Sequence, residues 1–166
     1  MPRLLLFRHA KAERTQPGST DHDRALTKSA RKDSAEMGKA IAAHGPVDLV
    51  LSSTARRARE TWDLASATLG GSPEVRLLRS IYDADDYLPI LRAEGGDAKT
   101  VLLIGHNPAM QETAAALVAD RRSADSATLA AGFPKATVAV LDFGGSWAEL
   151  SRGDARLTVF LLPQRE

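Results

Sequence analysis

An arginine and a histidine stand side by side directly after a short apolar run near the start of the chain. The run is Leu4-Leu5-Leu6-Phe7, and Arg8 and His9 follow it. A four-residue apolar run bounded by charged residues indicates a buried strand, and ligands of open α/β sheets bind outside the carboxyl ends of the strands. This pattern therefore places Arg8 and His9 where an α/β protein usually carries out its chemistry.

The same arrangement occurs twice more along the chain. Residues 47–51 form a second apolar run, and after it come Ser52-Ser53 and the basic segment Arg56-Arg57-Ala58-Arg59. Residues 101–104 form a third run, which is followed by Gly105-His106-Asn107-Pro108. The repetition predicts that two histidines and at least two arginines meet at one edge of a sheet.

Two histidines and two or more arginines at one place suit a phosphoryl group. A guanidinium fork matches phosphate oxygens, and helix N-termini after the strands add N–H donors. A neutral imidazole can attack phosphorus while a second, protonated imidazole stabilises the equatorial oxygens. We expect like-charge repulsion from the arginines to lower the pKa of the neighbouring histidine and to favour its neutral form.

Helices and further strands must position these residues. Thr27 is expected to cap the first helix, Ser53 the second, and Asn107 the fourth, whose first position is Pro108. The predicted helices span about 27–43, 54–69, 87–93 and 108–118. Additional short strands are predicted at 75–78, 137–141 and 157–161, the last two antiparallel. We therefore expect one domain over residues 1–166, a three-layer α/β/α fold with a central mixed, mostly parallel sheet.

Taken together, these segments resemble the histidine phosphatase (phosphoglycerate mutase-like) superfamily. The resemblance is carried by Arg8-His9, Ser52-Ser53, Arg57-Ala58-Arg59-Glu60-Thr61 and Gly105-His106-Asn107-Pro108. Features that look like its small phosphohistidine phosphatase branch, SixA, are the short length, Arg8-His9-Ala10-Lys11-Ala12, Asp23-Arg24-Ala25-Leu26-Thr27 and Gly132-Phe133-Pro134. The resemblance implies a phosphatase that works through a phosphohistidine intermediate without a metal or another cofactor.

The resemblance also implies roles for individual residues. His9 would be the nucleophile that is transiently phosphorylated, while Arg8, Arg57 and His106 would bind the phosphoryl oxygens. Among the clustered arginines, Arg57 is selected because it fits the Arg-Ala-x-x-Thr pattern of the family.

A general acid is the least defined part of the predicted site. Larger relatives supply it from an inserted segment, for which this chain has no room between its second and third predicted strands. The candidate is Asp83, and the alternatives are Asp85, Asp86 and Glu13. When the far nitrogen of a phosphorylated imidazole is already protonated, that imidazole leaves as a neutral group and needs no acid. We therefore expect a phosphorylated protein, bearing phosphohistidine, as the substrate; the alternatives are a small phosphoester and a noncatalytic phosphate-binding module.

The composition excludes several classes of protein. The chain has no cysteine, which excludes thiol catalysis, cysteine-ligated zinc and disulfides. Its 22 lysines and arginines nearly balance 21 aspartates and glutamates, so no general attraction to nucleic acid or membrane is expected. No apolar run approaches the length of a signal peptide or a membrane span, which favours a cytoplasmic protein. Arginines beside each candidate ligand would repel a metal ion.

Overall fold

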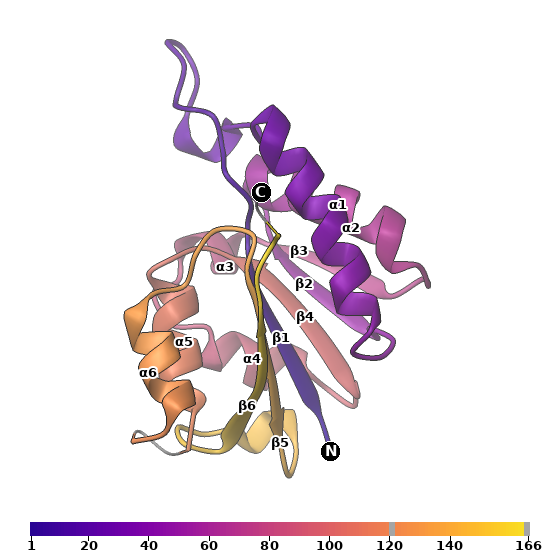
Figure 1. Ribbon diagram of the computed structural model, residues 1–166, viewed down its shortest axis with the longest axis vertical. Helices are drawn as coiled ribbons and strands as arrows, with labels where there is room; N and C mark the ends of the chain where they lie inside the picture. Colours follow the sequence, from indigo (N-terminus) through magenta and orange to yellow (C-terminus); the bar gives the residue numbers. More distant parts are fainter. Residues whose placement is uncertain (120–121, 165–166) are drawn as a thin grey trace.

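A single six-stranded sheet forms the centre of the computed structural model, which describes residues 1–119 and 122–164 (Figure 1). The strand order is β3-β2-β4-β1-β5-β6. The strands are β1 (Arg3–Arg8), β2 (Leu49–Ser53), β3 (Glu74–Leu78), β4 (Thr100–Gly105), β5 (Val138–Phe143) and β6 (Ala155–Leu161). The pairs among β1 to β4 are parallel, whereas β5 is antiparallel to both β1 and β6. The predicted mixed, mostly parallel sheet is thus confirmed.

Helices cover both faces of the sheet, which confirms the three-layer arrangement. The α-helices are α1 (Lys28–Ala42), α2 (Arg56–Leu69), α3 (Arg79–Asp83), α4 (Leu88–Glu94), α5 (Ala109–Leu117) and α6 (Ala124–Ala131). Two short 3-10 helices are η1 (Asp21–Asp23) and η2 (Trp147–Glu149). Figure 1 shows α1 and α2 on one side of the sheet and α4, α5 and α6 on the other. None of the helices in the described residues is long and apolar enough to cross a bilayer.

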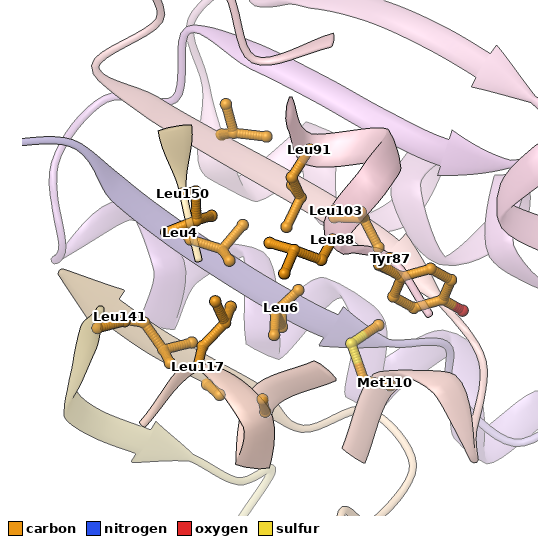
Figure 2. Close-up of a cluster of buried hydrophobic side chains, with 14 of the residues drawn as sticks. Leu4, Leu6, Tyr87, Leu88, Leu91, Leu103, Met110, Leu117, Leu141 and Leu150 are labelled. Atoms are coloured by element: carbon orange, nitrogen blue, oxygen red, sulfur yellow. The ribbon is translucent and has the colours of Figure 1, made fainter. Parts of the chain in front are cut away.

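The central strands are buried on both faces, and this burial fixes the register of β1 and hence the position of its last residue. Leu4 and Leu6 of β1 pack into the core beneath α4 and α5, as Figure 2 shows, while Leu5 and Phe7 pack into the core beneath α1 and α2. A slip of β1 by one residue would exchange the two faces and disrupt both cores. The position of Arg8 at the carboxyl end of β1 is therefore determined by the packing of the residues before it.

Several element boundaries differ from expectation. Thr27 caps α1 as predicted, by accepting a hydrogen bond from the Ala30 N–H. The expectation that Ser53 caps α2 is wrong, because Ser53 completes β2 and Ala55 occupies the cap position without a side-chain bond. Helix α5 begins one residue later than expected, although Asn107 Oδ1 does accept from the Gln111 N–H.

Two helices, α3 and α6, were not predicted. Each is short and buries one residue, Ile81 in α3 and Leu129 in α6. Neither sequence therefore carries the repeated apolar spacing that marks an amphipathic helix.

Candidate active site

His9 and His106 come from the carboxyl ends of adjacent parallel strands. In the β1–β4 ladder Arg8 lies opposite Gly105, and the His9 N–H donates to the Gly105 carbonyl over 3.1 Å. His9 and His106, which follow this pair, therefore lie side by side beyond the ends of the two strands, and their imidazole ring centres are 5.1 Å apart. Arg57 reaches the same place from the first turn of α2, because β2 is the other neighbour of β4.

The His9 ring is buried, and one of its two nitrogens is hydrogen-bonded to the backbone. His9 is 7% exposed, and its Nδ1 lies 2.7 Å from the Ala10 carbonyl oxygen. Because a carbonyl oxygen only accepts, Nδ1 carries the ring hydrogen and Nε2 keeps a free lone pair. Burial holds the pKa of His9 well below its usual value; the hydrogen bond to the Ala10 carbonyl opposes this lowering, and the charges of Arg57 and Arg8 add to it. The ring is therefore neutral and nucleophilic at Nε2, with burial contributing more than the expected arginine repulsion.

Both arginines are held by backbone carbonyls of nearby loops. Arg8 Nη1 donates to the Phe133 carbonyl over 2.7 Å. Arg57 is 7% exposed, and it donates from Nη1 to the Asp21 carbonyl over 2.9 Å and from Nη2 to Asp21 Oδ2 over 3.2 Å. These contacts fix the two guanidinium groups beside His9 before any ligand binds.

The ring of His106 is held by Ser53, for which the sequence predicts a helix cap and which also forms part of the family resemblance. Its Nε2 lies 2.7 Å from Ser53 Oγ, and the same hydroxyl accepts a hydrogen bond from the Ala55 N–H. Burial, followed by the charge of Arg57, lowers the pKa of His106 to about 4. His106 is thus neutral near pH 7 in the free protein. The protonated form expected from the sequence requires an anion beside it.

Unpartnered polar atoms mark the place where a ligand would bind. In the described residues, four buried side-chain nitrogen or oxygen atoms have no hydrogen-bond partner. Three of them are Arg8 Nε, Arg57 Nε and His106 Nδ1, and the fourth is Thr137 Oγ1. A buried polar group without a partner costs about 1–3 kcal/mol. Because the two arginines are cationic and donate only, an oxyanion is the ligand that would satisfy them.

The structure gives Asp83 a partner other than the histidines. Its carboxylate accepts from Arg79 Nε over 3.3 Å within α3, and 59% of the side chain is exposed. Asp86 accepts from the Leu88 N–H, while Asp85 and Glu13 are exposed. Within the described residues no carboxylate is hydrogen-bonded to His9 or His106. None of the four candidates is therefore held against either histidine in this structure, and the role of Asp83 as general acid stays a prediction.

Asp21 and Tyr82 are site residues that the sequence did not indicate. The Asp21 carboxylate accepts from Arg57, from Arg24 and from the Tyr82 hydroxyl, the last over 2.7 Å. The hydroxyl of Tyr82, then Arg24 and Arg57, lowers the pKa of Asp21 to about 2, so this carboxylate holds Arg57 and keeps no proton to donate near pH 7. The Tyr82 ring stands edge-on to His106 with 5.6 Å between the ring centres. Both residues lie in short polar segments without periodicity, and only their tertiary contacts identify them.

Comparisons with known proteins point to one family. Residues 4–81 match the model of the histidine phosphatase superfamily (branch 1). A structure provisionally assigned as phosphohistidine phosphatase SixA, from Nakamurella multipartitia, is 34% identical with a TM-score of 0.85, covering 98% of this chain and 96% of that one. A second structure with the same provisional assignment, from Agrobacterium tumefaciens, is 32% identical with a TM-score of 0.81, covering 98% and 99%. An uncharacterized protein of Mycobacterium tuberculosis is 32% identical over 95% of this chain and 100% of its own length.

We predict that sulfate, which stays a dianion above pH 4, binds with uptake of a proton at His106. An anion beside Nδ1 raises a pKa that is about 4 in the free protein. Sulfate affinity should therefore be greatest near pH 4 and fall by up to about tenfold per pH unit until the pH passes the raised pKa. Titrations by NMR between pH 4.5 and 8 measure this.

In the same titrations His106→Gln should flatten the pH dependence. His44→Gln should keep it, because His44 lies at the other end of β1, where its carbonyl accepts from Arg3. A sulfate affinity of the unaltered protein that does not change with pH would contradict the proton uptake.

Asp83→Asn should change kcat/KM for an aryl phosphate by less than about twofold, since the substitution removes only an exposed ion pair with Arg79. Steady-state hydrolysis of the variant and the unaltered protein tests this. A loss of more than tenfold would show that Asp83 does serve as the acid.

Proposed function

We propose that this chain, which belongs to the histidine phosphatase superfamily and to its SixA-type branch, hydrolyses phosphohistidine in proteins. Membership of this family identifies the general activity of the chain as that of a phosphatase. The observation that supports phosphoryl transfer at this site is the set of three unpartnered polar atoms, Arg8 Nε, Arg57 Nε and His106 Nδ1, together with a neutral His9.

In the first step, His9 Nε2 attacks phosphorus and the bond from phosphorus to the substrate nitrogen breaks, with its electron pair returning to that nitrogen. Arg8, Arg57 and His106 bind the phosphoryl oxygens, where negative charge is held in the transition state. The Nδ1–H of His9 stays on the Ala10 carbonyl, which stabilises the positive charge that the ring gains. These contacts exist before the substrate binds, so little reorganisation is needed.

In the second step, water attacks the phosphoryl group on His9 and the bond from phosphorus to Nε2 breaks. The electron pair returns to Nε2, the protons of the water end on inorganic phosphate or in solvent, and His9 becomes neutral again. The site then releases phosphate, and His106 gives up any proton it gained, because its pKa in the free protein is about 4.

The arrangement of carboxylates supports phosphohistidine over an ordinary phosphoester. When one imidazole replaces another on phosphorus, the bond that forms is of the same kind as the bond that breaks. A leaving imidazole with its far nitrogen protonated departs neutral, whereas an alkoxide needs a proton delivered by an acid. Asp83 pairs with Arg79, and the low pKa of Asp21 keeps that group ionised.

We predict that a phosphohistidine-bearing protein transfers phosphate to this enzyme and that the label vanishes in His9→Ala. His44→Ala is the control, because it removes a histidine at the far end of the sheet. The label on the unaltered protein should be acid-labile and alkali-stable, as expected for a phosphorus–nitrogen bond. Quenched incubation with labelled substrate, followed in parallel by phosphate release, measures both steps.

The same experiment separates the alternatives. Label and phosphate release from aryl phosphates but not from phosphohistidine would favour a small phosphoester as the substrate. Saturable phosphate binding with neither label nor release would instead favour a noncatalytic phosphate-binding module.

Without a positioned acid, the rate on aryl phosphates should depend steeply on the leaving group. We expect kcat/KM to fall on the order of a hundredfold as the leaving-group pKa rises from about 7 to about 10, because a general acid contributes factors of this size. A series of substituted phenyl phosphates measures the slope. A change of less than about threefold across the series would show that a proton is delivered after all.

A further inference from the structure

The hydroxyl of Tyr87 is bonded on both sides to the backbone of His106. It accepts from the His106 N–H over 2.8 Å and donates to the His106 carbonyl over 3.1 Å. Tyr87 is fully buried just before α4, and Figure 2 shows its ring at the edge of the apolar cluster with the hydroxyl pointing away from the leucines. A phenylalanine would fill the same apolar volume, so the hydroxyl serves the His106 backbone specifically.

The His106 carbonyl also accepts from the Met110 N–H over 2.8 Å, so it is chiefly the His106 N–H that depends on Tyr87, and the position of His106 in the chain explains why. The ladder of β4 with β1 ends at Gly105, and the ladder with β2 ends at Ile104. His106 is therefore the first residue beyond the sheet, and α5 begins only at Ala109. Burial raises the pKa of Tyr87 to about 12, so the hydroxyl keeps its proton and can donate as well as accept.

Neighbouring residues hold Tyr87 in this place. The Tyr87 N–H donates to Thr113 Oγ1 of α5 over 3.0 Å. A Cβ atom on Gly105 would lie 2.5 Å from the Tyr87 hydroxyl oxygen and 2.8 Å from the ring carbon that bears it. Glycine at position 105 is thus required by the close approach of the Tyr87 hydroxyl.

We propose that Tyr87 is a positioning residue for His106, which sets the ring of that histidine against Ser53 and His9 so that Nδ1 faces the phosphoryl group. This inference rests on the role proposed above for His106. Small displacements of a group that binds the transition state reduce the rate strongly, whereas they alter the binding of a loosely held substrate much less. Tyr87 acts through His106 and itself touches no reacting atom.

The test compares Tyr87→Phe with Trp147→Phe in the full chain. Trp147 is a matched control because its ring is also buried in the core beneath α4 and α5 and donates one hydrogen bond to a backbone carbonyl, that of Ala98. For Tyr87→Phe we expect kcat on an aryl phosphate to fall about tenfold while KM changes by less than about threefold. Sulfate affinity should fall severalfold and the NMR signals of the His106 ring should shift. Trp147→Phe should leave all four quantities near those of the unaltered protein.

The outcomes distinguish a failure of this inference from a failure of the proposed function. Equal effects of the two substitutions, or no change in the His106 signals of Tyr87→Phe, would overturn the positioning role. If the unaltered protein hydrolyses nothing, sulfate affinity and the His106 signals still decide the role of Tyr87. If Tyr87→Phe does not fold, Thr113→Val decides instead, because it removes the bond to the Tyr87 N–H and should displace the same signals in a folded protein.

Discussion

The parallel pairing of β1 with β4 is the constraint on which the site depends. It places Arg8 opposite Gly105 and so puts His9 and His106 at the same level, 5.1 Å apart. The pairing is held in register by two apolar cores, since Leu4 and Leu6 face one and Leu5 and Phe7 face the other. Residues that never approach a ligand thereby fix the distance between two imidazoles. The chemistry is positioned by the hydrophobic effect acting on both faces of a four-residue apolar run.

Much of this arrangement could be predicted from local sequence. Apolar runs that end in Arg8-His9 and Gly105-His106 predicted strands, and their shared edge predicted the meeting of the histidines. Asp21 and Tyr87 could not be found in this way, because each acts through a contact with a residue distant in the chain, Arg57 and His106 respectively. A serine before a helix predicts a cap, and this local signal does not reveal that the Ser53 hydroxyl contacts His106 as well as accepting from the Ala55 N–H. The role of Asp83 as general acid stays a prediction, and the structure pairs its carboxylate with Arg79.

The site combines fixed cations with neutral histidines, and burial is the reason. The pKa of His106 falls to about 4 and that of His9 falls well below its usual value, in both cases chiefly because the rings are buried. Arg8 and Arg57 remain charged, because a guanidinium loses its proton only far above neutral pH. The positive charge of these four side chains therefore lies on the two arginines, which are held by backbone carbonyls, while His9, the proposed nucleophile, keeps its lone pair.

An anion bound at this site shifts the protonation of His106 toward the charged form. A phosphoryl group that enters between the arginines satisfies their unpartnered Nε atoms and favours a proton on His106 Nδ1. His9 differs from His106 because its Nδ1–H is already bound to the Ala10 carbonyl, so the lone pair on Nε2 remains available to attack. The different roles proposed for the two histidines follow from the partner of one ring nitrogen in each. In His9 a carbonyl fixes a hydrogen on Nδ1, whereas in the less buried His106 the partner of Nε2 is a serine hydroxyl that can donate or accept.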